Sequence, residues 1–189
     1  MMENSKKLPG TCILMAGGKG ERMGNPQKFL IEVKGMTILE RLFVEIKGMF
    51  DSVYIAATSV NNERIREKCK ECNILVTSGD YYVSDLHLAL RRVQIFPVLV
   101  FGADTLIFSM DSFLTYLAIG YSVGKDLVNL ISRKSGFNAS IFKRAPLSLT
   151  EVLDHTDILI PDSVGMNINT PDDLRRAQSI IVSGGKKNQ

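Results

Sequence analysis

The stretch Thr11–Gly24, with the sequence TCILMAGGKGERMG, joins a short apolar run to a glycine-rich loop. The apolar part, Thr11–Ala16, has the length and composition of a strand that is covered on both faces. The glycine-rich part follows without a spacer, and a loop that leaves a parallel strand lies at the carboxyl end of the sheet, where α/β proteins bind their ligands. The stretch therefore predicts an α/β fold with a ligand site at this loop.

The residue types in the loop are typical of a site for a polyanion. Glycines let backbone N–H groups approach phosphate oxygens closely. Lys19, Arg22 and Lys28 can together offset much of the charge of a nucleoside triphosphate, which is roughly −4. A dinucleotide fingerprint is excluded because Met23 stands where its last glycine belongs, and the P-loop pattern does not occur in the chain. An ordinary glycine-rich turn is the plainer interpretation, but four glycines among three basic residues exceed what a turn requires.

Outward from this loop, apolar strands alternate with helical patterns through the first half of the chain. We expect strands at 53–58, 74–77 and 97–102, and helices at 37–50 and 85–93. Asn61 and Asn62 offer N-caps to a further, highly charged helix that runs toward Cys72. Such alternation predicts a mainly parallel sheet between two layers of helices, a three-layer α/β/α arrangement.

The second half of the chain has a less regular pattern. Between about residues 120 and 161 we expect strand pieces at 138–143 and 158–160 among polar turns, and then a strand at 164–168. Thr170, Pro171 and Asp173 form a pattern close to a capping box and predict a last helix. No repeat or linker divides the sequence, so we expect one domain over residues 1–189, with loose tails at about 1–9 and 183–189.

The composition excludes several classes of protein. The 23 basic and 20 acidic residues leave a formal net charge of +3, which is too balanced for an electrostatic nucleic-acid binder. No apolar run has the length of a membrane span, and the first residues lack the apolar segment of a signal peptide. These features predict a cytoplasmic protein with neither nucleic acid nor membrane as a partner.

The cysteines do not indicate a metal or disulfide scaffold. Their number is odd, and Cys69 and Cys72 form one C-x-x-C pair on the charged helix, without the second pair that a four-cysteine zinc site needs. We therefore expect a reducing compartment and no disulfide framework.

The pattern A-G-G-x-G-x-R-M-G over residues 16–24, followed by Lys28, resembles the signature of the MobA-like nucleotidyltransferase superfamily. That superfamily includes the molybdenum-cofactor guanylyltransferases and the sugar-phosphate nucleotidyltransferases. The resemblance implies a Rossmann-like fold of the nucleotide-diphospho-sugar transferase type. It also implies that the loop wraps a triphosphate, that Lys28 contacts the α-phosphate and that the backbone near Met15 lies close to the base. The nucleotide-binding residues implied in this way are Met15, Ala16, Gly17, Gly18, Lys19, Gly20, Arg22 and Lys28.

Two later segments resemble the metal side of the same superfamily. Asp104 follows the apolar strand at 98–101, and an Asp at that place implies a Mg²⁺ ligand. The segment NINTPDDL at 167–174 resembles the closing N-x-N-T-P-x-D-L motif, which implies Asn169 as the second ligand. Carboxylate and amide oxygens suit such a hard cation. The resemblance thus assigns catalysis to Arg22, Lys28 and Asp104, although Asp104 could also be a turn residue and 167–174 only the start of a helix.

Within the superfamily, the chain resembles the adenosylcobinamide-phosphate guanylyltransferases in particular. Thr77–Gly79, Tyr82 and Asp85–Leu86 are similar to their T-S-G…Y…D-L stretch. The resemblance implies GTP as the donor, adenosylcobinamide phosphate as the acceptor, pyrophosphate as a product and Gly79 as a neighbour of the guanine.

Other functions stay open at this point. The same chemistry could serve a molybdopterin or a sugar or alcohol phosphate, and a nucleotide-binding module without catalysis could share the fold. Residues 112–157 match the guanylyltransferases poorly, and an acceptor should be gripped there. That region could also form a homodimer contact or a flap.

Overall fold

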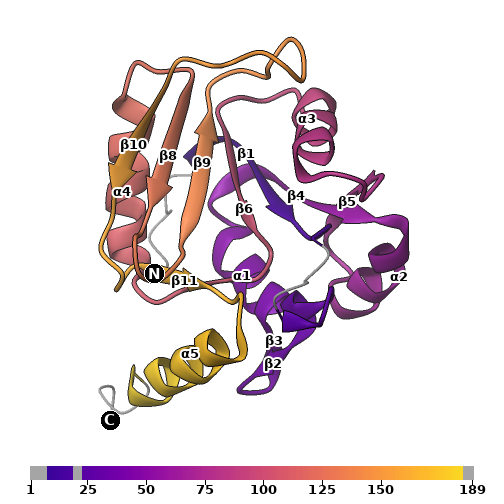
Figure 1. The fold of residues 1–189 in the computed structure, drawn as a ribbon, viewed down its shortest axis with the longest axis vertical. Helices are drawn as coiled ribbons and strands as arrows, with labels where there is room; N and C mark the ends of the chain where they lie inside the picture. Colours follow the sequence, from indigo (N-terminus) through magenta and orange to yellow (C-terminus); the bar gives the residue numbers. More distant parts are fainter. Residues whose placement is uncertain (1–7, 19–22, 185–189) are drawn as a thin grey trace, which may run out of the picture.

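A seven-stranded sheet runs through the centre of the molecule, which the computed structural model describes over residues 8–18 and 23–184 (Figure 1). All neighbouring strands are parallel except where the third strand from one edge, β9, runs antiparallel to both of its neighbours. The sheet is therefore mainly parallel, as the alternating pattern predicts. In spatial order its strands are β10 (His155–Leu159), β8 (Leu127–Ile131), β9 (Asn138–Phe142), β6 (Val98–Gly102), β1 (Leu8–Met15), β4 (Phe50–Thr58) and β5 (Asn73–Thr77).

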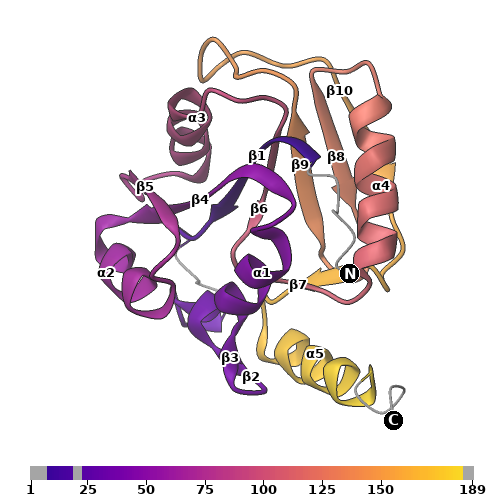
Figure 2. The same cartoon turned by 180° about the vertical axis from the view of Figure 1, so that it is seen from behind.

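Helices cover both faces of this sheet and give the expected three layers. The helices α1 (Ile38–Ile46), α2 (Ser59–Lys68) and α4 (Met110–Ser122) share a core with one face, while α3 (Tyr82–Arg92) packs on the other. Views from the two sides show α3 across the sheet from α1 and α4 (Figures 1 and 2). On the α3 face, the segment 143–154 adds Leu153 to the core, so one helix and one loop together form that layer.

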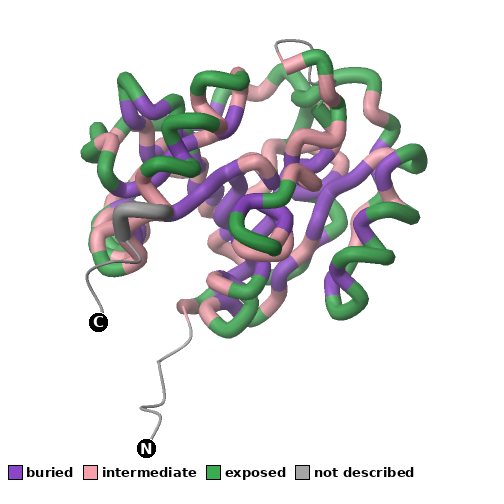
Figure 3. The backbone as a smooth tube through the Cα atoms, turned by 90° about the horizontal axis from the view of Figure 1, so that it is seen from below, coloured by how far each residue is buried: buried purple, intermediate pink, exposed green. Residues whose placement is uncertain are grey.

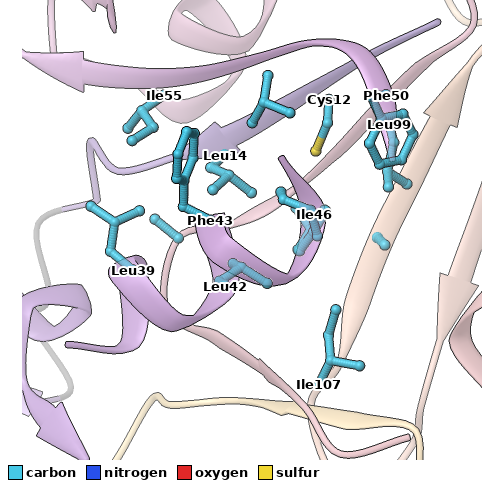
Figure 4. Packing of buried hydrophobic residues seen from close by; sticks show 14 of the residues in the cluster. Cys12, Leu14, Leu39, Leu42, Phe43, Ile46, Phe50, Ile55, Leu99 and Ile107 are labelled. Carbon is cyan, nitrogen blue, oxygen red and sulfur yellow. The ribbon is translucent and has the colours of Figure 1, made fainter. Parts of the chain in front are cut away.

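The larger core lies between the sheet and α1. Thr37 and Glu40 begin α1 with a capping box, in which each side chain bonds the backbone of the other residue. Burial of each large apolar side chain contributes about 1.5–3 kcal/mol, so the face of α1 that meets β1 and β4 is a major source of stability. Close by lie Leu39, Leu42, Phe43 and Ile46 of the helix and Cys12, Leu14 and Ile55 of the strands (Figure 4).

Buried residues are concentrated along the strands rather than the helices (Figure 3). In β6 the four residues 98–101 are all buried, because the strand is covered on both faces. This agrees with the almost wholly apolar run at 97–102, and it places β6 beside β1 in the middle of the sheet.

Two short antiparallel sheets and the last helix lie below the carboxyl end of the main sheet. One is the hairpin of β2 (Glu32–Val33) and β3 (Met36–Thr37); the other joins β7 (Thr105–Ile107) to β11 (Gly165–Asn167). Helix α5 (Pro171–Gly184) packs against them through a core that includes Ile168 and Ala177. The strand expected at 164–168 is therefore present, but it lies outside the main sheet.

The region from 110 to 160 contains more regular structure than its sequence pattern indicates. Both α4 and β8 lie in it, and neither is predicted above. Apolar residues are spread around α4 instead of forming a stripe, and it buries only Phe113, Leu117 and Gly120. Periodicity therefore does not reveal the helix, and tertiary packing decides it.

The expected N-cap of α2 is wrong. Thr58 is the N-cap, and its hydroxyl accepts a hydrogen bond from the backbone N–H of Asn61, which lies inside the first turn and is buried. Asn61 is free for another role because a threonine three residues earlier already caps the helix.

The expectation of no disulfide is also wrong. Helix α2 ends at Lys68, so the C-x-x-C pair lies in the following turn, where Cys69 and Cys72 form a disulfide. The turn brings the two Cα atoms to 5.5 Å, a normal separation for a disulfide, and sequence spacing alone does not show this. Cys12 is a buried free thiol.

Parts of the two segments expected to be loose tails, about 1–9 and 183–189, belong to regular elements. Leu8 and Pro9 belong to β1, and residues 183 and 184 belong to α5. Within residues 8–18 and 23–184, no helix combines the length and the apolar composition that crossing a membrane requires.

Candidate functional site

A cleft opens at the carboxyl ends of β1 and β6, where the strand order of the sheet changes direction. It consists of two adjoining cavities of about 450 and 270 Å³, and Met15, Gly18 and Tyr82 line both of them. Open α/β sheets bind ligands at this kind of position, so the fold itself favours a site here.

The exit of β1 is held from both sides by backbone contacts. Met15 is opposite Ala56 of β4 and Gly102 of β6, and the N–H of Ala16 donates to the carbonyl of Ala56 at 2.7 Å. The buried side chain of Asn61 donates its Nδ2 hydrogen to the carbonyl of Ala16 at 3.0 Å. The sequence pattern indicates only a cap at Asn61, whereas the structure shows that this side chain fixes the start of the glycine-rich loop.

Lys28 lies in the 3-10 helix η2 (Lys28–Leu30), and its side chain points into the larger cavity. Its ammonium group forms an ion pair with the Asp104 carboxylate and donates to Oδ1 of Asn169 at 2.9 Å. The side chains of Lys28 and Asp104 are only 15% and 13% exposed. Residues that are far apart in the sequence therefore converge on one partly buried cation.

Asp104 reaches this position from the turn between β6 and β7. A Cβ atom at Gly102 would collide with Oδ1 of Asp104, so a glycine there lets the carboxylate lie over the strand end. The carbonyl of Asp104 accepts a hydrogen bond from the N–H of Ile168 at 3.0 Å. This bond, with the pairing of β7 and β11, sets Asn169 beside Asp104.

The start of α5 is capped without the side chain of either asparagine of the NINTPDDL segment, although the backbone N–H of Asn169 also donates to Asp173 at 3.1 Å. Asp173 accepts hydrogen bonds from the N–H and hydroxyl of Thr170, and the Thr170 hydroxyl accepts from the N–H of Asp173. The capping box predicted from the sequence is confirmed. The Asn169 side chain thus faces the cleft, and its role as a metal ligand stays a prediction.

The smaller cavity is bordered by the turn at Gly79. Gly79 has a φ of +81°, and a Cβ atom there would lie 2.6 Å from the methyl carbon of Thr58. The buried carboxylate of Asp85 accepts from the Gly79 N–H at 3.1 Å and from the Ser78 hydroxyl at 3.1 Å. Asp85 therefore acts inside the protein as an anchor of this turn.

Several residues that line the cleft are not named as site residues by the sequence, among them Tyr82, Asn138 and Ser140. Tyr82 separates the two cavities, and Asn138 and Ser140 of β9 form the wall across from the glycine-rich loop. More than half of Tyr82 is exposed, yet two causes raise the pKa of its hydroxyl. The larger cause is partial desolvation of the hydroxyl, and the smaller is the negative charge of Asp104. A sequence signal exists for Tyr82, which is the tyrosine of the T-S-G…Y…D-L stretch three residues after Gly79, but none exists for Asn138 and Ser140.

All predicted site residues that the structure describes line one of the two cavities. Their functional roles stay predictions. Lys19, Gly20 and Arg22 lie outside the described residues. The residues brought together are Met15, Ala16, Gly17, Gly18, Lys28, Gly79, Asp104 and Asn169.

Comparison with known proteins agrees with this geometry. Residues 12–155 match the model of the MobA-like NTP transferase domain. A probable molybdenum cofactor guanylyltransferase of Aquifex aeolicus is 27% identical over 191 aligned residues, with 90% of each chain covered. An adenosylcobinamide-phosphate guanylyltransferase of Methanocaldococcus jannaschii is 28% identical over 195 residues, which cover 92% of this chain and 98% of that one.

The fold is shared with solved structures as well. Molybdopterin-guanine dinucleotide biosynthesis protein A from Archaeoglobus fulgidus superposes with a TM-score of 0.68 at 18% identity, over 92% of this chain and 99% of that one. The family match covers most of the chain, including the second half of β1, Lys28 and Asp104. The chain therefore belongs to the MobA-like NTP transferase family, and it is a nucleotidyltransferase.

Proposed function

We propose that this protein transfers GMP from GTP to a phosphate-bearing acceptor and releases pyrophosphate. An oxygen of the acceptor phosphate attacks the α-phosphorus, a new P–O bond forms, and the bond to the pyrophosphate leaving group breaks. The observation that carries the proposal is the convergence of Lys28, Asp104 and Asn169 beside the exit of β1. Such a reaction needs positioning and charge neutralisation rather than a covalent enzyme intermediate.

The two cavities suit the two ends of the nucleotide. The smaller one is bordered by the glycines Gly17, Gly18 and Gly79, whose lack of side chains leaves room for a planar base and its sugar. The larger one holds Lys28, whose ammonium group would contact the α-phosphate. Lys19, Gly20 and Arg22 of the same loop would complete the contacts to the triphosphate.

Asp104 and Asn169 fit the oxygen ligands that Mg²⁺ requires. In the structure both oxygens already contact a cation, the Lys28 ammonium group, so their placement suits a positive charge. Within residues 8–18 and 23–184 no cluster of three or more acidic, histidine or cysteine side chains could hold a metal ion. Mg²⁺ typically takes one or two protein carboxylates and completes its shell with phosphate oxygens and water. When bound there it would neutralise charge on the triphosphate.

We propose adenosylcobinamide phosphate as the acceptor. The support is the relative from M. jannaschii, whose name states this acceptor, together with the T-S-G…Y…D-L stretch that forms the Gly79 turn and the start of α3. The relative from A. aeolicus favours a second candidate, a molybdenum-cofactor precursor.

The test is release of pyrophosphate from GTP with Mg²⁺. We expect release with adenosylcobinamide phosphate and little release when the acceptor is omitted. Release with a molybdopterin acceptor instead would favour the second candidate acceptor over adenosylcobinamide phosphate. Failure of every phosphate-bearing acceptor would overturn it.

Base selectivity has its own measurement. GTP should raise the melting temperature more than ATP, CTP or UTP at equal concentration, because tighter binding stabilises the native state more. Equal shifts for the four nucleotides would refute guanine selectivity.

A further inference from the structure

A third cavity, of about 410 Å³, lies on the α3 face of the sheet. We call it the α3 groove. One wall is α3 with Val83, Leu86 and Leu90; the floor is β8 and β9 with Leu127 and Phe142; the other wall is the segment 146–153. Its volume lies in the range of pockets for small molecules.

The groove continues from the catalytic cleft. Tyr82 lines the cleft, and the next residue, Val83, lines the groove. On the floor, Ser140 lines the cleft and donates its hydroxyl hydrogen to Oδ1 of Asn129 at 2.7 Å, and Asn129 lines the groove. The linings of the cleft and the groove therefore adjoin on this face of the sheet, at Tyr82 and Val83 and at Ser140 and Asn129.

The outer wall is built by specific contacts rather than being a loose loop. Arg144 forms ion pairs with Asp126 at 2.9 Å and with Glu151 at 2.8 Å, and the other oxygen of Glu151 accepts from the N–H of Leu147. Arg91 of α3 donates to the carbonyl of Leu147 at 3.5 Å. The views from both sides show this segment passing over the sheet toward α3 (Figures 1 and 2).

The lining of the groove is apolar and open to solvent. Val83, Leu149 and Val152 are 60%, 56% and 86% exposed, and they surround its mouth. Exposed apolar residues that gather at a cavity mark a binding surface more often than scattered ones do. The groove also has polar lining residues, among them His87, Asn129 and Glu151.

We propose that the α3 groove binds the non-reacting body of the acceptor, and that this body is broad and largely apolar and carries its phosphate on an arm that reaches Lys28. The inference rests on the proposed nucleotidyl transfer and deepens it, because it assigns the acceptor class from the groove. A compact, strongly polar acceptor would leave the groove unused. An acceptor with a large apolar body would gain affinity from burial there.

The test compares acceptor and donor kinetics in groove variants. Leu149→Asp and Val152→Asp place a charge at the mouth, where it opposes the burial of an apolar ligand. We expect each to raise the KM for adenosylcobinamide phosphate by about tenfold, which is 1.4 kcal/mol, while the KM for GTP stays unchanged. Val44→Asp, at a residue of α1 that is 54% exposed and distant from the groove, is the matched control and should change neither constant.

A direct probe accompanies the kinetics. Anilinonaphthalene sulfonate should fluoresce on binding the wild-type groove and be displaced by adenosylcobinamide phosphate but not by GTP. Unchanged acceptor KM in both Asp variants would overturn the groove while leaving nucleotidyl transfer standing. The groove assignment would also be overturned if the wild type is a dimer and Val152→Asp makes it a monomer without changing the acceptor KM. That result would show that a second copy of the chain occupies the groove. If no phosphate acceptor supports transfer by the wild type, the proposed function and the groove assignment fail together.

Discussion

The cleft and the α3 groove adjoin each other, yet they are built in different ways. The cleft takes its shape from backbone: adjacent parallel strands place Met15 beside Gly102, and the turn after β6 carries Asp104 to the same edge. The groove takes its outer wall from side chains, because the ion pairs of Arg144 hold the segment 143–154 in place. Exposed ion pairs contribute little stability and can be replaced cheaply, whereas strand register cannot be changed without loss of the core. Substitutions that change the shape of the cleft therefore disturb the core, whereas substitutions in the groove wall do not.

The largest expected effect is on the cleft. Lys28→Ala and Asp104→Ala should each lower the rate of transfer by about 100-fold or more, because each removes a charge that acts on the developing transition state. Both side chains are at the surface of a cleft rather than in the core, so melting followed by circular dichroism should show a folded protein.

Lys125→Ala is the matched control for that pair, because it also breaks an ion pair, with Asp154, away from the cleft. Its activity should equal that of the wild type. Near-normal turnover in both cleft variants would dismiss their catalytic roles.

The second effect concerns the cation between Asp104 and Asn169. Because the Lys28 ammonium group already contacts both oxygens, Lys28→Met should let Mn²⁺, as a reporter for Mg²⁺, bind without nucleotide about tenfold more tightly, or 1.4 kcal/mol. Electron paramagnetic resonance of free and bound Mn²⁺ measures this. The double variant Lys28→Met with Asp104→Asn should lose the gain, and equal affinity in Lys28→Met and the wild type would contradict the assignment of the two ligands.

A third change tests the anchor of the Gly79 turn. In the wild type, the N–H of Gly79 donates to both carboxylate oxygens of Asp85 at 3.1 Å. Asp85→Asn replaces one of these oxygens with an NH₂ group, which cannot accept, and leaves the other as an uncharged and weaker acceptor. Loss of a buried hydrogen bond to a charged group costs about 2 kcal/mol, and for a chain of this size the melting temperature should fall by roughly 4–8 °C.

The KM for GTP should rise in the Asp85→Asn variant, while the KM for the acceptor stays near normal. Asp111→Asn, at an exposed residue of α4 that lines neither cavity of the cleft, serves as the control. A lowered melting temperature with unchanged GTP affinity would show that the turn supports the fold but not the nucleotide.

The smallest effect is expected at the groove wall and depends on pH. Hydrogen bonds from Arg144, then from the backbone N–H of Leu147, lower the pKa of Glu151. Because the folded pKa lies below the unfolded value, the stabilisation is present above the unfolded pKa and is lost as the pH falls through the folded pKa. Between pH 6 and about 3, the wild type should therefore lose slightly more thermal stability than Glu151→Gln.

Glu71→Gln is the matched comparison, since Lys47 lowers the pKa of that exposed carboxyl in the same way. Both variants should flatten the pH dependence of melting, but only Glu151→Gln should raise the acceptor KM. An equal acceptor KM in the two variants would show that Glu151 in the groove wall does not affect acceptor binding.

Much of the cleft could be predicted from the sequence because its parts are local. A strand, a glycine-rich loop and Lys28 follow one another within a short stretch, and the capping box at Thr170 needs only neighbouring residues. The groove could not be predicted. Helix α4 and strand β8 lack a clear hydrophobic period in the sequence. The ion pairs of Arg144 with Asp126 and Glu151 depend on the pairing of β8 with β9, which the sequence does not show.

The amino-acid sequence by itself predicted which strand ends in a glycine-rich loop, and which lysine, carboxylate and amide lie in the same cleft. The tertiary structure alone decided that Asn61 holds the loop, that Cys69 pairs with Cys72 and that one lysine meets oxygens from two distant segments. The physical reason is the separation in sequence over which the interactions act. Residue type and spacing set local conformation and charge, whereas contacts between distant segments depend on strand order and register, which form only when the whole core packs.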